Sequence, residues 1–259
     1  MSIHNLAVVH KHAYIGENVT IGPFAVIGEH AVIGNDCTIG SHVVIDGWTE
    51  IGEACTFHTG AVIGSPPQDL KYQGEETRLV IGKHNVFREY VTVNIGTVGG
   101  GGVTRLGDHC LMMAYSHVAH DCQIGNHVIF ANCAALSGHI HVEDYAIIGG
   151  LSGIHQFSRI GAHCIIGGCS GVSQDIPPYM MATGSRAKVY GLNSLGLKRR
   201  EFSEESIAAL QKAYRLLFRS KLSVKHALEK IRTDVPDCPE VAHLIAFIES
   251  SERGICHGA

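Results

Sequence analysis

An imidazole, a carboxylate and a bare glycine occur in the middle of the chain at a spacing that could bring them into one site. His120 precedes Asp121, and Gly138 and His139 follow these two residues at an interval of 18. Imidazole is the natural general base near neutral pH, and a neighbouring carboxylate can orient it. A glycine N–H with no side chain in the way can donate to an oxyanion. The set predicts attack on a carbonyl group held between His120 and Gly138.

Other polar residues continue the same interval. Gln156 follows Gly138 by 18 residues, with His155 beside it, and His117 stands three residues before His120. A lone histidine among the 18 in this chain would carry little weight, but their alignment points to a site. His117-x-x-His120 also resembles a zinc ligand pair, which leaves a metal site as an alternative interpretation.

A period of six residues would place these groups side by side. Aliphatic or aromatic residues recur at this interval from Ile3 to Ile63, again from Ile81 to Val93, and then without a slip from Leu106 to Val172. This period fits neither an α-helix nor an alternating strand, but it fits short strands joined by tight turns, three to a coil. Residues 18 apart then lie one coil apart, about 4.7–4.9 Å from each other. We therefore predict a mainly β protein, a parallel β-helix whose stacked coils bury an aliphatic column.

Two segments interrupt the period and predict external loops. Residues 65–80 contain Pro66-Pro67 and charged residues at positions that should point inward. Residues 99–105 shift the phase and begin with four consecutive glycines. Long loops on a rigid repeat scaffold usually carry function, so we expect both loops to protrude and the second to be mobile.

The β pattern ends at Pro177-Pro178, which divides the chain into a β-helix over 1–178 and a helical domain over 179–259. Helical periodicity predicts three helices there: one capped by Ser203, one capped by Ser223, and one that begins at Pro239. These helices would cover the open end of the β-helix, an edge that otherwise invites aggregation.

Composition excludes several classes of protein. A formal net charge of −4 argues against a nucleic-acid binder. No apolar run approaches the about 20 residues of a membrane helix, and the first ten residues lack the features of a signal peptide. The nine cysteines contain no C-x-x-C pair, so we expect buried free thiols in a reducing cytoplasm.

Several motifs together resemble the acyl-carrier-protein-dependent UDP-N-acetylglucosamine O-acyltransferases of lipid A biosynthesis, a family of the hexapeptide-repeat acyltransferase superfamily. The motifs extend over nearly the whole chain and comprise Gln68–Tyr72, Ala119–Asp121, Leu136–His139, Ile147–Gly150, His155–Phe157, Gly167–Gly171, Gln174–Tyr179 and Gly196–Arg200. Because the hexapeptide repeats of this superfamily wind to the left, the resemblance implies a left-handed parallel β-helix of hexapeptide repeats with a C-terminal α-helical domain.

The resemblance implies a cytoplasmic homotrimer with active sites between subunits. It would transfer a 3-hydroxyacyl chain from acyl carrier protein to the 3-hydroxyl of UDP-N-acetylglucosamine, with no metal and no cofactor besides the carrier thioester. His120 would be the general base, Asp121 would orient it, and the Gly138 N–H would bind the oxyanion. The positions that match substrate contacts are Gln68, Asp69, Lys71, His117, His139, His155 and Gln156, and near the nucleotide phosphates Asn193, Arg199 and Arg200.

A group of basic residues in the helical domain contrasts with the negative charge of the whole chain. It comprises Lys198, Arg199, Arg200, Arg215, Arg219, Lys221 and Lys225. A solvated helix face explains any single one of them, but as a group they could steer an acidic carrier protein.

Some positions depart from the family pattern. Asn94-Ile95 stands where the family often has His-Arg, and Leu195 stands where an acidic residue is expected. The sugar, N-acetylglucosamine or an amino-substituted analogue, is therefore less well defined than the reaction. The alternatives are an N-acyltransferase of a later lipid A precursor, which usually has an additional N-terminal domain before its repeats, a zinc-dependent hexapeptide-repeat hydratase, and a purely structural β-helix.

Overall fold

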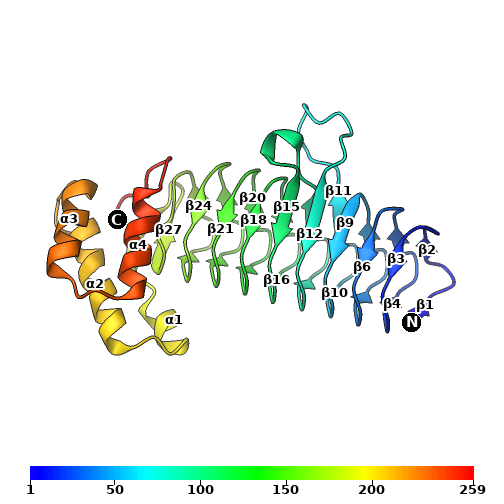
Figure 1. Ribbon diagram of the computed structural model, residues 1–259, viewed down its shortest axis with the longest axis horizontal. Coiled ribbons are helices and arrows are strands. Elements are labelled where there is room, and N and C mark those ends of the chain that lie inside the picture. Colours follow the sequence, from blue (N-terminus) through cyan, green and yellow to red (C-terminus); the bar gives the residue numbers. More distant parts are fainter.

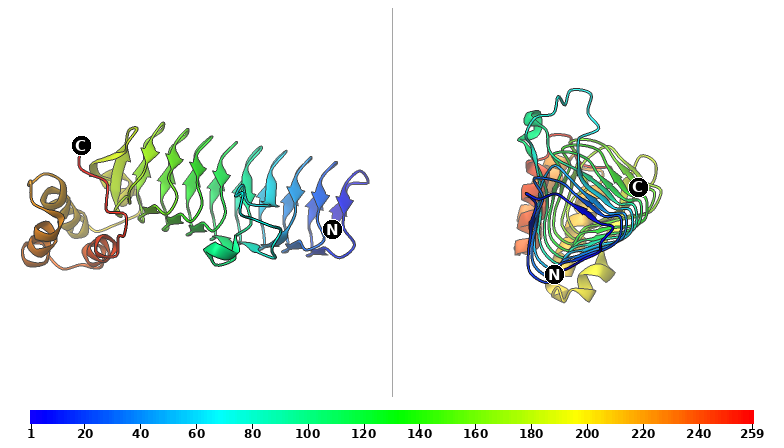
Figure 2. Two further views of the ribbon diagram at one scale, coloured as in Figure 1. Left: turned by 90° about the horizontal axis from the view of Figure 1, so that it is seen from above. Right: turned by 90° about the vertical axis from the view of Figure 1, so that its right-hand side faces the viewer.

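The computed structural model describes all 259 residues as a long three-sided prism with helices at its C-terminal end (Figure 1). Viewed along its axis, the prism has a triangular outline (Figure 2). Each side is a parallel sheet, and each coil contributes one short strand to every side, as the period of six predicts.

Three sheets form the sides, and we call them A, B and C. Sheet A contains β1 (Ser2–Ile3), β4 (Thr20–Ile21), β7 (Thr38–Ile39), β10 (Thr56–Phe57), β13 (Val86–Phe87), β16 (Leu111–Met112), β19 (Ile129–Phe130), β22 (Ile147–Ile148), β25 (Ile165–Ile166), β27 (Met180–Thr183) and β28 (Lys188–Leu192). Sheet B contains β2 (Val8–Val9), β5 (Val26–Ile27), β8 (Val44–Ile45), β11 (Val62–Ser65), β14 (Thr92–Asn94), β17 (His117–Val118), β20 (Ala135–Leu136), β23 (Gly153–Ile154) and β26 (Gly171–Val172). Sheet C contains β3 (Tyr14–Ile15), β6 (Val32–Ile33), β9 (Trp48–Ile51), β12 (Arg78–Ile81), β15 (Val103–Leu106), β18 (Gln123–Ile124), β21 (His141–Val142) and β24 (Arg159–Ile160).

The register of the strands gives the interval of 18 a direct structural meaning. Val118 pairs with Leu136, and Leu136 pairs with Ile154, so successive coils stack without offset. The interval is longer only where a loop is inserted, because Ile51 pairs with Ile81 and Ile81 with Leu106. The two inserted segments lie between β11 and β12 and between β14 and β15, and both project from the same part of the prism (Figure 1).

The loop bounds differ slightly from those predicted. The first inserted segment is Pro66–Thr77, because Ser65 and Arg78 belong to strands. The second is Ile95–Gly102 and contains the 3₁₀ turn η1 (Val98–Gly100), whereas residues 103–105, predicted as loop, pair with β12 and β18 in β15.

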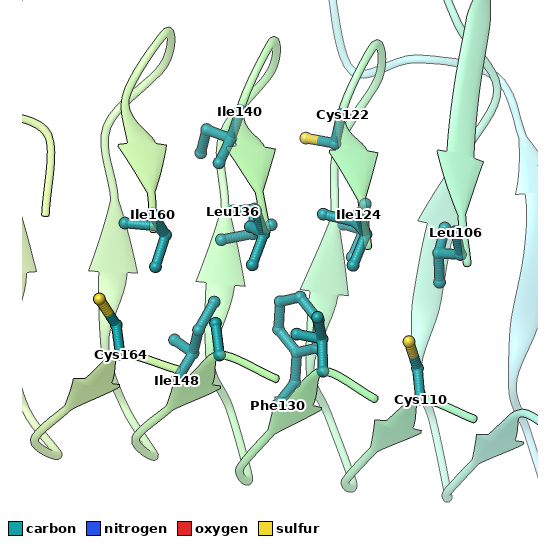
Figure 3. Close-up of a cluster of buried hydrophobic side chains, with 14 of the residues drawn as sticks. Leu106, Cys110, Cys122, Ile124, Phe130, Leu136, Ile140, Ile148, Ile160 and Cys164 are labelled. Carbon is teal, nitrogen blue, oxygen red and sulfur yellow. The ribbon is translucent and has the colours of Figure 1, made fainter. Parts of the chain in front are cut away.

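In each short strand one residue, usually aliphatic, points inward, and together these residues form one hydrophobic core. Side chains of stacked coils lie in columns: Leu106, Ile124 and Ile160 belong to one column of sheet C, in which Val142 lies between the last two (Figure 3). Six of the nine cysteines are buried, all nine are free thiols, and burial raises the pKa of Cys110 to about 11. The predicted buried thiols are therefore present, although Cys133 and Cys169 are exposed.

Aromatic and polar residues occupy many corner turns in the left-handed region, which glycine and asparagine adopt most readily. Tyr115, Asp121 and Tyr145 have φ of 62°, 61° and 63°. This conformation costs a non-glycine residue roughly 1–2 kcal/mol, and stacking between coils offsets part of that cost. The rings of Tyr90 and Tyr115, for example, stack with centroids 5.1 Å apart.

The C-terminal part contains four helices: α1 (Ser194–Arg199), α2 (Glu204–Phe218), α3 (Val224–Asp234) and α4 (Pro239–Glu249). Ser203 and Ser223 cap α2 and α3 through their side-chain oxygens, as predicted, whereas α1 was not predicted. The sheet continues beyond the boundary predicted at residue 178, since β27 pairs in parallel with β25 and β28 returns antiparallel to β27. None of the helices combines the length and the apolar character needed to cross a membrane.

Candidate active site

The corner between sheets B and C, which we call edge BC, positions the residues that could do chemistry. The turn from β17 to β18 contains His120 and Asp121, and the corresponding turn one coil later contains Gly138 and His139. The coils are joined at this edge by a hydrogen bond from the His139 N–H to the His120 carbonyl, 3.0 Å long. Residues that are 18 positions apart in the sequence are thus in direct contact.

His120 and Asp121 form a hydrogen-bonded pair. The His120 Nδ1 lies 2.7 Å from the Asp121 Oδ2, and the Asp121 side chain is completely buried, whereas 13% of the His120 side chain is exposed. Because a carboxylate only accepts hydrogen bonds, the proton belongs on Nδ1. In the neutral ring the Nε2 atom is then the unprotonated one, which is the state that a general base requires.

Gly138 lies against the His120 ring. A Cβ atom at this glycine would lie 2.5 Å from the His120 Cε1 and 2.8 Å from its Nε2, so no other residue fits without displacing the imidazole. The Gly138 N–H donates to no acceptor within the chain. A free backbone donor therefore stands beside the unprotonated ring nitrogen.

Two further histidines flank the pair and are held neutral. Burial, with His120 nearby, lowers the pKa of His117, whose Nδ1 is 2.7 Å from the Thr92 hydroxyl. Burial also lowers the pKa of His139, against the opposing effect of Asp121, which lies 3.8 Å from its Nε2. The His139 ring stacks on Phe157 of the next coil with centroids 4.5 Å apart. Neutral imidazoles at these positions can exchange hydrogen bonds with a polar ligand.

A cavity of about 280 Å³ opens between this edge and the two inserted loops. His139 and Phe157 line it from the prism, Asp69 and Lys71 from the first loop, and Thr97 from the second. Gln68 is exposed beside Asp69, and the Asp69 carboxylate accepts a hydrogen bond from the Lys71 N–H at 3.0 Å. Two of the three predicted ligand contacts in the first loop therefore face the same space as His139.

His155 and Gln156 lie one coil further along edge BC, and both are exposed. The His155 Nδ1 is 3.1 Å from the Gln156 carbonyl oxygen and 3.4 Å from an Arg253 guanidinium nitrogen. Their place in the same row as Gly138 agrees with the predicted spacing.

The remaining predicted site residues lie at a different corner, between sheets C and A, which we call edge CA. Arg199 and Arg200 line a cavity of about 480 Å³ with Tyr145 and His163, and the Arg200 guanidinium lies 4.0 Å above the Tyr145 ring. Burial, with the Arg200 charge nearby, lowers the pKa of His163 to about 4. One chain alone does not bring these arginines to His120.

Asn193 has a structural role that the sequence did not indicate. Its side-chain oxygen accepts from the Gly196 N–H at 3.1 Å and caps α1, and its Nδ2 donates to the His163 carbonyl at 2.8 Å. The residue is 5% exposed, so its polar atoms serve mainly to hold α1, and with it Arg199, against edge CA.

A metal ion would find three ligands at edge BC. One atom each of His120, Asp121 and His139 lie within 4.8 Å of one another. The Asp121 carboxylate, however, already accepts two hydrogen bonds from Thr97, so its lone pairs are partly committed to protein donors. The ligand set predicted from His117-x-x-His120 differs from this one, because His117 bonds to Thr92 instead.

Thr97 and Gly100 contact the candidate site, and sequence reasoning missed both of them. The Thr97 N–H and hydroxyl both donate to Asp121, and a Cβ at Gly100 would lie only 2.0 Å from the Asp121 Cγ. The only signal was the interruption of the period with consecutive glycines, which gives no register for the inserted residues.

Comparison with known proteins shows which families share this architecture. The family described as bacterial transferase hexapeptide (six repeats) matches residues 30–65 and 104–138, and the family described as UDP N-acetylglucosamine O-acyltransferase, domain 2, matches residues 175–256. The acyl-[acyl-carrier-protein]–UDP-N-acetylglucosamine O-acyltransferase of Thermodesulfovibrio yellowstonii is 54% identical over 98% of both chains.

Solved structures agree with this comparison. The UDP-N-acetylglucosamine O-acyltransferase of Moraxella catarrhalis superposes with a TM-score of 0.95 at 42% identity and covers 99% of this chain and 100% of that one. The UDP-N-acetylglucosamine acyltransferase of Campylobacter jejuni gives a TM-score of 0.94 at 38% identity, with both chains covered completely.

The fold and the matched repeats define a hexapeptide-repeat transferase, and the predicted left-handed parallel β-helix with C-terminal helices is confirmed. Within that class, the chain belongs to the family of acyl-[acyl-carrier-protein]–UDP-N-acetylglucosamine O-acyltransferases. The resemblance identified from the motifs is likewise confirmed over nearly the whole chain.

Proposed function

We propose that this protein transfers a 3-hydroxyacyl chain from acyl carrier protein to the 3-hydroxyl of UDP-N-acetylglucosamine, the first step of lipid A biosynthesis in the cytoplasm. Membership of the family supports the reaction, and the contact between His120 and Gly138 supports the mechanism. That contact carries the proposal, because it brings the base and a free backbone donor together at one place on edge BC.

The steps follow from these groups. The unprotonated His120 Nε2 removes the proton from the sugar hydroxyl, and the resulting oxygen attacks the thioester carbonyl. The tetrahedral oxyanion accepts a hydrogen bond from the Gly138 N–H, and the imidazolium is stabilised by Asp121. Collapse breaks the C–S bond, and the His120 proton goes to the departing carrier thiolate. A positioned base is worth about 10²–10⁴ in rate, and one oxyanion donor about 10²–10³.

We further propose that the active protein is a homotrimer. The outward residues of sheet A in the later coils are apolar and include Leu111, Ile129 and Ile147, whereas those of sheet C include Arg105 and Gln123. The corner between sheets A and B exposes Tyr90, Tyr115 and Leu151 at 50%, 60% and 67%. Large exposed apolar surfaces of this kind mark protein–protein contacts.

Three prisms with these corners at a common axis would set sheet A of each copy against sheet B of the next. Edge BC, with His120, would then stand beside edge CA of the neighbouring subunit, with Arg199 and Arg200. This arrangement supplies the arginines that one chain lacks at its own edge BC. Their guanidinium groups suit a pyrophosphate through forked hydrogen bonds.

The decisive experiment compares the wild type with His120→Ala, using UDP-N-acetylglucosamine and 3-hydroxyacyl carrier thioesters of several lengths, and weighs the products. We expect transfer by the wild type and at least a hundredfold less by the variant, with both eluting at a trimer mass in light scattering. Near-normal turnover by a trimeric His120→Ala protein would refute the base. Substituting a UDP-sugar with a 3-amino group as acceptor tests the alternative sugar.

The His120–Asp121–His139 cluster favours a second candidate, a zinc-dependent hydratase. Elemental analysis of the purified protein separates the two. One transition metal per chain, together with an activity that a chelator abolishes, would support the hydratase. Acyl transfer that withstands the chelator would support the acyltransferase.

A further inference from the structure

We infer that Thr97 is a positioning residue of the candidate active site: it fixes the carboxylate that orients the general base. The inference rests on the proposed function and deepens it. Thr97 lies in the inserted segment between β14 and β15, outside every repeat, and its two hydrogen-bond donors both point to Asp121.

The contacts cover both oxygens of the carboxylate. The Thr97 N–H donates to the Asp121 Oδ1 at 2.8 Å, and the Thr97 hydroxyl donates to the Oδ2 at 2.6 Å. The Oδ2 atom also accepts from the His120 Nδ1 at 2.7 Å. Thr97 and His120 therefore share one oxygen atom, and rotation of the Asp121 side chain would break all three bonds together.

The direction of the hydroxyl follows from its other neighbour. The Gly100 N–H donates to the Thr97 Oγ1 at 3.2 Å, so this oxygen already acts as an acceptor. The Asp121 carboxylate has no proton to offer, which leaves the hydroxyl proton directed at the carboxylate. Gly100 itself closes over the carboxylate, because a Cβ there would lie 2.0–2.4 Å from its three atoms.

The backbone of Thr97 is fixed as well. The Thr97 carbonyl accepts from the Gly102 N–H at 2.8 Å, and the preceding Gly96 carbonyl accepts from the Thr77 hydroxyl at 2.6 Å. Thr77 is 1% exposed and ends the first inserted loop. The two loops that border the cavity at edge BC thus meet at Gly96, directly before the residue that holds Asp121.

A completely buried carboxylate needs donors, because no lysine or arginine forms an ion pair with Asp121 in this chain. Thr97 supplies two of its three side-chain hydrogen bonds. Removal of the hydroxyl alone would leave Oδ2 with only His120, loosen the carboxylate, and weaken its hold on the Nδ1–H tautomer of the ring. The expected loss falls on the chemical step and not on substrate binding.

The test uses Thr97→Val, which keeps the branched shape and removes the hydroxyl, and Thr97→Ser, which restores it. Thr49→Val is the matched control, because Thr49 is also buried and its hydroxyl donates at 2.6 Å to the Asp46 carbonyl, far from His120 in the sequence and outside the site. Thr97→Ala serves as a second hydroxyl-free variant should the valine protein not fold.

With acyl carrier thioester and UDP-sugar, we expect Thr97→Val to lower kcat about tenfold or more, with KM for both substrates within about twofold of the wild type. Thr97→Ser should recover most of the rate, and Thr49→Val should match the wild type. A hydroxyl-free variant that folds and keeps kcat within threefold of Thr49→Val would overturn the inference.

A second readout separates failure of the inference from failure of the proposed function. If the wild type transfers no acyl group, the proposed function is wrong. In that case ¹⁵N NMR of the His120 ring still tests whether Thr97 positions Asp121. At pH 8 we expect the Nδ1–H tautomer in the wild type, Thr97→Ser and Thr49→Val, and a mixture of tautomers in Thr97→Val. An unchanged tautomer in that variant would contradict the positioning role.

Discussion

Gly138 shows at the scale of one residue why a spacing rule can predict a site. An interval of 18 brings Gly138 beside His120, and the missing side chain lets the imidazole lie against the backbone. Thr97 belongs to the same site but could not be predicted, because an inserted segment has no register with the coils. Contacts along a regular edge can be predicted from the spacing of residues in the sequence, whereas contacts made by a loop depend on the path of its backbone.

His163 offers a residue-scale prediction about pH. Burial and Arg200 lower its pKa to about 4 from 6.5, and its Nδ1 is buried without a partner. The unfolded chain takes up the proton near pH 6.5 and the folded chain does not, so stability is full above pH 6.5 and declines as the pH falls towards 4. The variant His163→Phe keeps the stack between Tyr145 and Tyr179. Between pH 7.5 and 5 we expect its free energy of unfolding to fall by about 1 kcal/mol less than that of the wild type, after allowance for solvent screening.

The measurement is urea unfolding of both proteins at the two pH values. The comparison with the variant isolates His163 from the other 17 histidines, which titrate in both proteins. The same acid sensitivity in wild type and variant would show that His163 is protonated in the folded state.

At the scale of the elements, the strands are too short to be stable alone, and the bonds between coils hold them. In the turn between β12 and β13, Asn85 performs this role with its side chain. Its Nδ2 donates to the Gly107 carbonyl at 2.9 Å, and its Oδ1 accepts from the Cys110 N–H at 2.7 Å. Both partners belong to the next coil, so one completely buried amide joins two coils.

We expect Asn85→Ala to lower the free energy of unfolding by about 2 kcal/mol, because it leaves a buried donor and a buried acceptor without partners. Asn35→Ala is the control, since the exposed Asn35 accepts from the Glu17 N–H at 2.8 Å and water can replace it. Its expected cost is about 0.5 kcal/mol. Equal losses from the two variants in chemical denaturation would contradict the role given to Asn85.

The elements also show how far sequence periodicity reaches. The caps at Ser203 and Ser223 predicted α2 and α3, because a capping side chain and an apolar stripe are local signals. The short helix α1 lacks such a stripe, and the capping role of Asn193 depends on contact with edge CA, which no local pattern reveals. The strands β27 and β28 were not predicted, because they follow Pro177-Pro178 and lack the period of six.

For the whole molecule, the periodicity predicted one long prism but could not say which of its faces would be used. In the later coils the structure assigns different surfaces to the sides of the prism, with apolar residues outward on sheet A and charged or polar ones on sheet C. Arg199 and Arg200 lie at another edge than His120, which sequence reasoning could not distinguish from a shared site. In the proposed trimer, assembly would be part of the chemistry, since a second copy would unite the two edges.

Charge distribution gives a prediction at the same scale. The helices at the C-terminal end expose Arg215 and Lys225, although the chain carries a net charge of −4. An acidic carrier protein would be steered to this end, and screening shortens such attraction to about 8 Å at physiological ionic strength. We expect kcat/KM for the carrier thioester to fall about tenfold between 50 and 500 mM NaCl, and that for a small acyl-pantetheine thioester to fall less than about twofold.

Exchange of Arg215 and Lys225 for glutamine should reduce kcat/KM for the carrier thioester at low salt and flatten its salt dependence, because steering charges act on the encounter and not on the chemical step. The matched control exchanges Lys11 and Lys83, two exposed lysines of the β-helix, and so alters the net charge equally. If both double variants lose the same salt dependence, net charge alone is responsible. A carrier thioester whose kcat/KM is insensitive to salt in the wild type would exclude electrostatic docking at the helical end.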